Sequence, residues 1–433
     1  MDPVLIGTLS AFVLIVLIVA GVPIGIAMVT VGLAGQVLLL GVPEAIAQLG
    51  FIVTQKGMNF LLTAIPLFIL MGQLVYRTGL GSRLFEAAYL LVGSLPGGVS
   101  LATVVSSALF GSVTGSSIAT VSSIGSLALP EMRKYKYDLA FSSATIAASG
   151  TLSVLIPPSL FLIIYGSISG VSIADLFIAS LIPAAILTAF FVVASLVLCM
   201  AKPRLGPPGP KSSAARKLAS LFQVAPIALV FVVIVGGMSL GFFTATEAAA
   251  VGALSVMVIA AMFRSLALPA VLSALRESVS MSGSLFLIIV GGGMIGALFA
   301  QTEVTRLAAD FIVAREFSAL WFILFIVVLY IAFGTVLDAL SMLVLLTPIL
   351  LPIAITMGYD PVWFGIVVIV LAELAMITPP VGINVYVVGT LVPDVPIAKI
   401  FRFTMPFVVL MLLLIALATA FPEIILWLPR VVG

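Results

Sequence analysis

Apolar stretches separated by short polar or glycine- and proline-rich segments make up most of this 433-residue chain. Many of them approach the length of roughly 20 residues that an α-helix needs to cross a bilayer. The pattern predicts an all-α polytopic membrane protein with about ten transmembrane helices. The expected helices cover residues 4–20, 23–40, 60–76, 139–167, 176–200, 220–238, 244–263, 280–300, 362–392 and 403–421.

Two apolar segments, residues 98–130 and 317–352, do not fit this simple count. Each is too long for one spanning helix and too short for two. Each carries a polar cluster that begins with glycine, Gly111–Ser117 in the first segment and Gly334–Asp338 in the second. Half-length arms joined at such a cluster are typical of a re-entrant helical hairpin, whose tip must face protein, water or a ligand.

Part of the chain also occurs twice. Tyr137-Asp138 opens a segment that contains Pro157-Pro158, and Tyr359-Asp360 opens one that contains Pro379-Pro380. The offset is 222 positions at both landmarks (359 − 137 and 379 − 157). Two successive prolines remove two N–H donors and predict a break in each helix. A duplicated break at membrane depth indicates a transporter-type binding site.

The duplication predicts two inverted repeats, residues 1–200 and residues 220–433, joined by a linker at residues 201–219. Within them we expect scaffold helices over 1–95 and 220–300, re-entrant hairpins over 98–130 and 317–352, and broken helices over 139–167 and 362–392.

The charges predict how the chain is oriented. The linker 201–219 is rich in Lys and Arg and contains no acidic residue, so the positive-inside rule places it in the cytoplasm. Counting spans backwards from the linker puts the N-terminus, with Asp2, in the periplasm. The two hairpins then enter the membrane from opposite faces, as an inverted repeat requires.

Composition narrows the chemistry. Hydrophobic residues make up 63% of the chain and charged residues 8%, which excludes a soluble globular protein and gives no basic surface for nucleic acid. The chain has no histidine and one cysteine, so histidine-ligated metal sites and intrachain disulfides are excluded. We therefore expect no enzyme activity and no cofactor other than a coupling ion.

Hydroxyl and acidic side chains near the hairpin tips and helix breaks are the candidate site. Ser and Thr in membrane helices often bond only their own backbone, which is the alternative interpretation. Asp338 and Glu373 lie in apolar sequence, where an ionisable residue is a functional candidate by default. Oxygen ligands without a carboxylate cage favour Na⁺. The candidate residues are Ser112, Thr114, Gly115, Ser116, Ser149, Gly150, Thr151, Pro157, Gly334, Thr335, Asp338, Glu373, Thr378, Pro379, Gly382 and Asn384.

Two other motifs have structural explanations. Thr244 and Glu247 have the spacing of a helix capping box. Gly291-Gly292-Gly293, inside a predicted span, allows close helix packing or a flexible joint.

Over essentially its whole length the chain resembles the large membrane (M) subunit of tripartite ATP-independent periplasmic (TRAP) transporters, of the ion-transporter superfamily. The motifs that carry the resemblance are Ile65-Pro66-Leu67-Phe68 with Gly72, Gly111–Ser117, Ser149-Gly150-Thr151 with Ile156-Pro157-Pro158-Ser159, Thr244–Ala248, Asp338 and Thr378-Pro379-Pro380-Val381-Gly382.

This resemblance implies secondary active uptake of a small organic anion, driven by Na⁺ and using an elevator motion. It implies a location in the bacterial inner membrane and two protein partners, a small four-helix membrane subunit and a periplasmic substrate-binding protein. Substrates in the family include C4-dicarboxylates, sialic acid and other carboxylates or sulfonates, and the motifs do not distinguish them.

Three alternatives stay open at this point. The first is a stand-alone Na⁺- or H⁺-coupled anion carrier of similar fold that needs no binding protein. The second is an intramembrane enzyme, which would have little chemistry available, since the chain has no histidine, one cysteine and no HExxH motif or paired catalytic acids. The third is a passive channel, which could not accumulate its substrate.

Overall fold

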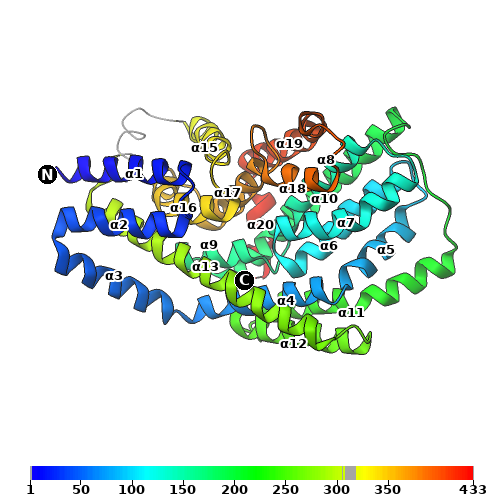
Figure 1. Ribbon diagram of the computed structural model, residues 1–433, viewed down its shortest axis with the longest axis horizontal. Helices are drawn as coiled ribbons and strands as arrows, with labels where there is room; N and C mark the ends of the chain where they lie inside the picture. The colour runs from blue at the N-terminus through cyan, green and yellow to red at the C-terminus, as the bar shows by residue number, and fades with distance from the viewer. Residues whose placement is uncertain (1, 305, 308–317, 433) are drawn as a thin grey trace.

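The computed structural model describes residues 2–304, 306–307 and 318–432, and it contains no β-strand within them (Figure 1). The fold class is therefore all-α, as predicted. The helices are α1 (Pro3–Val19), α2 (Ile24–Leu40), α3 (Val42–Gly57), η1 (Phe60–Thr63), α4 (Ala64–Arg77), α5 (Leu80–Val92), α6 (Gly98–Thr114), α7 (Ser117–Lys134), α8 (Leu139–Leu155), α9 (Leu160–Ser169), α10 (Ile173–Ala201), α11 (Ala214–Ser239), α12 (Ala245–Met262), α13 (Leu268–Gln301), α15 (Ala319–Phe333), α16 (Ala339–Thr356), α17 (Pro361–Ala375), α18 (Ile383–Leu391), α19 (Ile397–Ala420) and α20 (Glu423–Val432).

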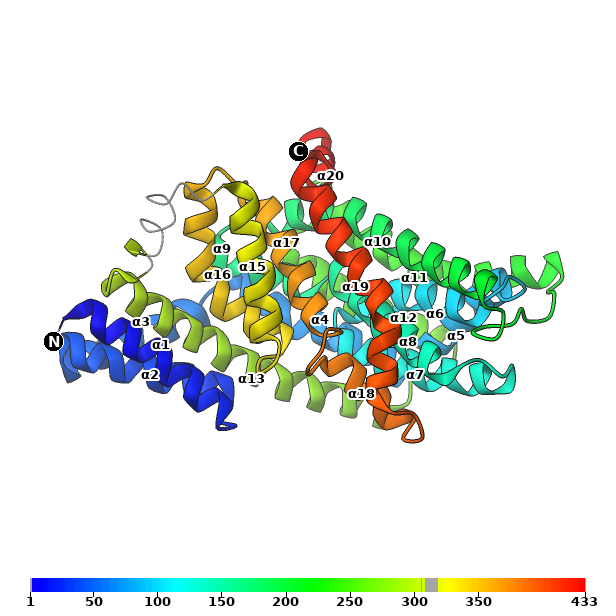
Figure 2. The ribbon, with the colours of Figure 1, turned by 90° about the horizontal axis from the view of Figure 1, so that it is seen from above.

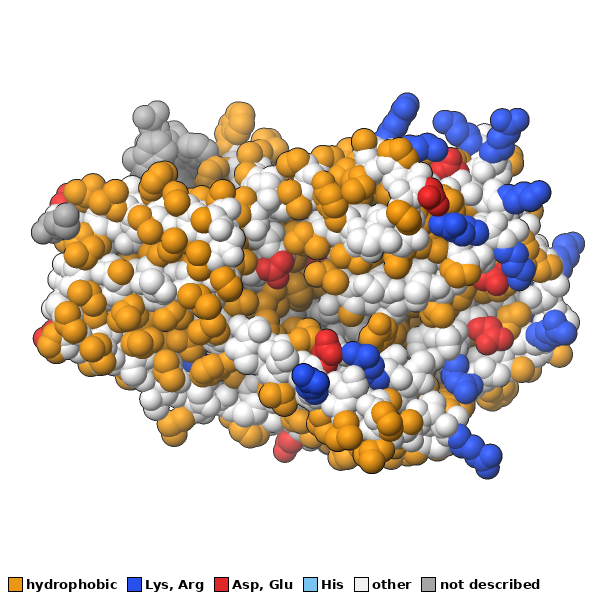
Figure 3. Space-filling view, in the orientation of Figure 1, with side chains coloured by type: hydrophobic (Ala, Val, Ile, Leu, Met, Phe, Trp, Pro, Cys, Tyr) orange, Lys and Arg blue, Asp and Glu red, His pale blue; other side chains and the backbone are white. Residues whose placement is uncertain are grey.

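Several helices have the length and the apolar composition that a lipid bilayer requires. Among the described residues, six helices are long and apolar enough to span, or up to eight if each of two bent helix pairs forms one span. The protein surface is apolar over much of its length, and Lys and Arg gather at one end (Figure 3). That end holds the connection between α10 and α11 (Figure 1).

Helices α2 and α13 pack closely because glycines lie where they meet. A Cβ added at Gly32 would lie 2.7 Å from Met294 Cβ, and one added at Gly291 would lie 2.7 Å from Met28 Cβ. Small residues let membrane helices approach in this way, because lipid tails offer no hydrophobic drive for association. The Gly291-Gly292-Gly293 run thus serves close packing.

Each predicted hairpin corresponds to two antiparallel arms with a break at the expected cluster. In the first, α6 ends at Thr114 and α7 begins at Ser117. In the second, α15 and α16 are joined by residues 334–338, and both pack against α17 (Figure 2). The expected start at residue 317 lies outside the described residues.

Both hairpins extend further than their prolines suggested. Pro130 lies inside α7, which continues to Lys134, and Pro352 lies inside α16, which continues to Thr356. A proline removes one N–H donor but leaves the following turn free to continue, and neighbouring helices support the backbone in a membrane. The predicted ends at 130 and 352 were therefore too early by about one turn.

Both broken helices begin with the same cap. Asp138 Oδ1 accepts hydrogen bonds from the N–H groups of Ala140 and Phe141, and Asp360 Oδ1 accepts from Val362 and Trp363. The breaks separate α8 from α9 and α17 from α18, and the Pro-Pro pair lies within each break. The duplicated sequence therefore builds duplicated local structure.

Several boundaries differ from the sequence-based expectation. Helices α3 and α20 were not predicted, because charged residues interrupt their apolar pattern and both have strongly amphipathic sequences. Helix α11 begins at Ala214, inside the expected linker 201–219, and α13 begins at Leu268 rather than at residue 280. Polar residues in the early turns of both helices interrupt the apolar pattern, so the sequence did not predict that the helices begin there.

The rest of the linker is ordered against the first hairpin. Gly97 N–H donates to Gly206 O at 2.8 Å, and the Tyr137 hydroxyl donates to Pro207 O at 2.9 Å while accepting from Val99 N–H. Burial raises the pKa of Tyr137 to about 12, so this hydroxyl stays a neutral donor. The predicted capping box is confirmed, with Thr244 and Glu247 bonding reciprocally at the start of α12.

Candidate functional site

The tip of the first hairpin lies against the first helix break. Gly115 ends α6 in the left-handed conformation, with φ of 57°. A Cβ added there would lie 3.0 Å from Leu160 N, the first residue of α9. A Cβ added at Gly150 would lie 3.1 Å from Ser117 O. Glycine at these two predicted positions therefore allows the tip to reach the break.

The second hairpin tip lies against the end of α17, just before the second break. Gly334 is buried, and an added Cβ there would overlap the Ala375 side chain. Asp338 occupies the N-cap position of α16, is half-buried, and makes no capping hydrogen bond from its side chain. Both tips thus meet a broken helix.

Glu373 links the two halves of the chain. Its side chain is 1% exposed and lies in the last turn of α17. Its Oε1 accepts a hydrogen bond of 3.1 Å from the hydroxyl of Ser117, the first residue of α7. Its Oε2 is buried and has no hydrogen-bond partner among the described residues. A carboxyl group buried at membrane depth with a free oxygen calls for a further partner.

Asn384, on the other side of the second break, also has buried side-chain atoms without a hydrogen-bond partner. The residue is fully buried in the first turn of α18, and neither its Oδ1 nor its Nδ2 has a partner within the described chain. Its backbone N–H donates to Met376 O at 3.1 Å, which joins the start of α18 to the end of α17. Gly382 makes this arrangement possible, because it precedes α18 with φ of 54°.

Most of the predicted hydroxyls already donate to a backbone carbonyl three or four residues earlier in the chain. Because a hydroxyl oxygen has two lone pairs, each of them can still accept or ligate. The bonds are Ser112 to Leu109 O, Thr114 to Phe110 O, Ser149 to Thr145 O, Thr151 to Ala148 O, Thr335 to Ala332 O and Thr378 to Leu374 O.

The predicted residues lie at or near the two hairpin tips and the two helix breaks. Gly115, Ser116 and Gly150 lie around the first tip, next to Pro157, which is buried in the first break. Gly334, Thr335 and Asp338 form the second tip. The second break holds Glu373, Thr378, Pro379, Gly382 and Asn384, of which Pro379 is exposed.

The sequence-based set omitted several buried hydroxyls near the tips and breaks and on α16. Ser117 donates to Glu373, and Ser159, Ser341 and Thr347 have buried hydroxyl oxygens without a partner in the described structure. Ser159 could have been found, because it follows Pro157-Pro158 directly. Ser341 and Thr347 lie on α16, in an otherwise apolar helix that gave no signal.

The ligands offered are hydroxyls, amides, free carbonyls and few carboxylates. No group of three or more His, Cys, Asp or Glu residues that could hold a metal occurs within the described residues. A small monovalent cation suits such a donor set better than a divalent metal.

Comparison with known proteins identifies the family. Residues 11–424 match the family model described as "Tripartite ATP-independent periplasmic transporter, DctM component". The chain belongs to this family. It is therefore a TRAP transporter large permease and a multi-pass membrane protein.

Curated relatives cover nearly the whole TRAP permease. It is 34% identical over 418 residues to the sialic acid TRAP transporter large permease protein SiaM of Vibrio cholerae, which covers 96% of both chains. It is 31% identical over 406 residues to the C4-dicarboxylate TRAP transporter large permease protein DctM of Pseudomonas aeruginosa, covering 93% of this chain and 94% of the relative.

A solved structure shares the fold. The YdaH transporter of Alcanivorax borkumensis superimposes with a TM-score of 0.60 at 15% identity, covering 88% of this chain and 89% of that one. At this identity the likeness describes the fold alone. The relatives named here are transporter permeases or transporters, as expected for a chain predicted not to be an enzyme.

Proposed function

We propose that this TRAP permease carries out Na⁺-coupled uptake of a small organic anion. The observation that carries the proposal is the buried junction of Ser117 with Glu373, where a hairpin tip from one half meets a helix break from the other. Glu373 Oε2 has no partner within the described residues, and neither do Oδ1 and Nδ2 of Asn384, on the other side of the second break. Glu373 Oε2 and Asn384 Oδ1 are therefore unfilled oxygen ligands.

A cation is the ligand that best fits these groups. Leaving a buried polar atom unsatisfied costs about 1–3 kcal/mol, more for a charged one. Na⁺ would satisfy carboxylate, amide and hydroxyl oxygens together, and one carboxylate would offset its charge. A proton on Glu373 is the second candidate, favoured by its burial in apolar surroundings.

An anionic substrate would be held without a basic side chain. The hairpin tips place the N-termini of α7 and α16 near the breaks, and helix N-termini present free N–H groups to anions. The relatives named for sialic acid and for C4-dicarboxylates agree with a carboxylate substrate. The substrate class proposed is a small carboxylate or sulfonate.

The proposed mechanism is alternating access by an elevator motion. The hairpins and broken helices would move as one body against the scaffold helices, and the two tips would open to opposite sides of the membrane. In the proposed orientation the N-terminus is periplasmic and the basic linker is cytoplasmic, in the bacterial inner membrane.

The family description names a tripartite system, which supports two protein partners. We assign these as a small four-helix membrane subunit and a periplasmic substrate-binding protein. A stand-alone carrier of similar fold is the competing assignment.

Uptake into proteoliposomes tests the proposal. The chain and its small subunit would be reconstituted, with the candidate binding protein outside and a panel of labelled organic acids. An inward Na⁺ gradient would be compared with equal K⁺ and with a proton gradient. We expect accumulation that needs both Na⁺ and the binding protein.

Other outcomes would contradict parts of the proposal. Accumulation without the binding protein would establish the stand-alone carrier, and proton-driven accumulation would replace Na⁺ as the coupling ion. Flux that only equilibrates the substrate would indicate a channel.

A further inference from the structure

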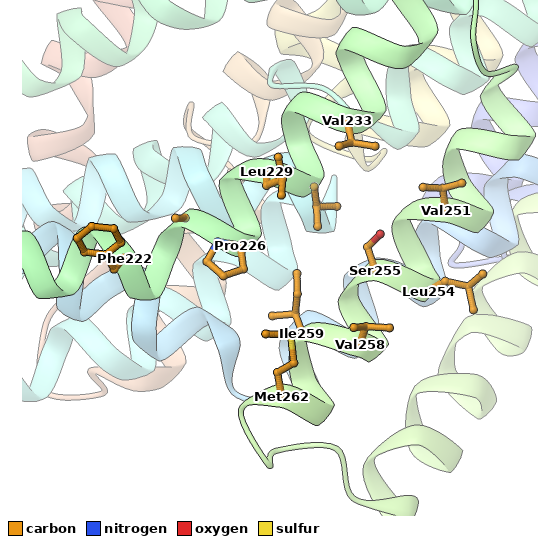
Figure 4. Close-up of a pocket in the computed structure, with 12 residues that line it drawn as sticks. Phe222, Pro226, Leu229, Val233, Val251, Leu254, Ser255, Val258, Ile259 and Met262 are labelled. Atoms are coloured by element: carbon orange, nitrogen blue, oxygen red, sulfur yellow. The ribbon is translucent and has the colours of Figure 1, made fainter.

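An apolar groove runs between α11 and α12, and no residue of the hairpin tips or helix breaks lines it. It has a volume of about 800 Å³, and side chains from both helices face the space between them (Figure 4). Its walls are largely exposed, with Phe222 at 72%, Leu254 at 62% and Met262 at 71%. Apolar walls at this exposure belong in contact with the membrane interior.

Basic side chains gather near one end of the groove. The groove extends to Phe222 and Met262 at the end away from the turn that joins the two helices (Figure 4). Arg264 follows α12 directly and is exposed. Arg83 on α5 places its guanidinium carbon 4.1 Å from the centroid of the Phe263 ring, so it lies at the same end.

The first turn of α11 adds two more positive charges. Arg216 is exposed, and Lys217 donates to the carbonyl of Leu91 at 3.3 Å, which fixes its position without neutralising it. None of Arg83, Arg216, Lys217 and Arg264 forms an ion pair with a described carboxylate. Positive charges without acidic partners beside an apolar groove suit an amphiphile with an anionic head.

We propose that this groove binds an anionic phospholipid of the bilayer. Its acyl chains would lie between α11 and α12, and its phosphate would face Arg83, Arg216 and Arg264. Basic pockets between membrane helices on the cytoplasmic side bind anionic lipid headgroups in this way. This is the side on which we expect these residues to lie, from the charge pattern.

The size of the groove suits a small amphiphile. Its volume of about 800 Å³ is within the range of about 300–1,000 Å³ typical of small-molecule sites. A helix from another protein could lie against the groove with one face alone, and the crosslinking test below distinguishes that occupant from a lipid.

Lipid selectivity provides the first test. The full chain would be placed in nanodiscs of phosphatidylcholine with a minor fraction of phosphatidylglycerol, and retained lipid would be measured by native mass spectrometry. We expect selective retention of phosphatidylglycerol, falling about five-fold for each of Arg83→Gln and Arg264→Gln. Arg276→Gln, an exposed basic residue on α13 outside the groove, is the matched control and should retain it.

Photocrosslinking provides the second test, with full chain and small subunit together. A photoreactive residue at Ser255, in the groove, should crosslink to phosphatidylglycerol, and one at Val232, exposed on α11 outside the groove, should show no preference between the lipids. Crosslinking of position 255 to the small subunit alone would overturn the proposal. Equal loss of lipid in the Arg276→Gln variant, or no preference for phosphatidylglycerol, would also overturn it.

Discussion

The two helix breaks have the same local design but differ in burial and charge. Each follows a Tyr-Asp cap and contains a Pro-Pro pair, 222 positions apart. In the first break, Pro157, Pro158 and Ser159 are all buried, and α8 and α9 contain no charged residue. In the second, Pro379 and Pro380 are exposed, and Glu373 and Asn384 stand on either side.

This difference indicates that the two copies of the broken helix have different roles in the proposed ion binding. The first break is closed by the first hairpin tip through glycine contacts, so the oxygen atoms it offers are those of backbone carbonyls and hydroxyls. The second adds a carboxyl oxygen, Glu373 Oε2, and the side-chain amide of Asn384, which lack partners within the described chain. We therefore expect substitutions at the second break to change ion dependence most, and equivalent changes at the first to change it less.

The largest expected effect is that of Glu373→Gln. Hydrogen bonds and contacts of a charged group contribute about 1.5–3 kcal/mol, or roughly ten- to a hundred-fold in an equilibrium constant. We expect the half-saturating Na⁺ concentration for uptake in proteoliposomes to rise by this factor. Glu423→Gln, an exposed acid paired with Arg430, is the control. Unchanged Na⁺ dependence in the Glu373→Gln variant would remove Glu373 from the ion site.

Asn384→Leu should separate stability from ion binding. Without Na⁺, removing a buried amide that has no partner should raise the stability by about 1 kcal/mol, because its desolvation is no longer uncompensated. With Na⁺, the stabilisation that the ion gives to the native chain should be lost. Thermal unfolding with and without Na⁺ measures both changes.

The first broken helix supplies the control for Asn384. Ser149→Ala, inside α8, removes a hydroxyl that already donates to Thr145 O, so it should change stability little and keep most of the response to Na⁺. A loss of the response in Ser149→Ala as large as in Asn384→Leu would show that the two broken helices are equivalent in ion binding.

Sequence reasoning located the tips and breaks but not the contact between the halves. Pro-Pro, glycine clusters and the 222-residue offset are local signals, and they indicated where each helix would be interrupted. The bond from Ser117 to Glu373 joins residues 256 positions apart, and nothing in the local pattern of either residue specifies it. The apolar neighbours of Glu373 suggested that its side chain is buried. The absence of partners for the Asn384 side chain, by contrast, depends on how the start of α18 packs in the fold.

Ser117→Ala tests the contact between the halves directly. The hydroxyl donates to Glu373 Oε1, and its loss should weaken Na⁺ dependence by up to about ten-fold, the lower range for a bond to a charged acceptor. Ser126→Ala on the same helix α7, whose hydroxyl donates to Ser123 O, is the matched control. If the two variants behave alike in the Na⁺ titration of uptake, the bond to Glu373 has no role in coupling.

The smallest effects are expected at the caps, where the two repeats are most alike. Asp138→Ala and Asp360→Ala each remove an N-cap, which costs about 1 kcal/mol of stability. Asp138 also accepts from Lys399 at 3.3 Å, but this pair is partly exposed and contributes at most about 0.2–1 kcal/mol. Chemical unfolding of both variants should therefore differ by less than the cap itself.

A double-mutant cycle resolves that small difference. Combining Asp138→Ala with Lys399→Met isolates the ion pair, while Asp360→Ala with Lys399→Met should be additive, because no contact joins those two residues in the described structure. A coupling energy above about 1 kcal/mol for the first pair would mean that this contact holds the two halves together more strongly than its exposure implies. The caps would then differ as much as the breaks, and the asymmetry would extend along the whole repeat.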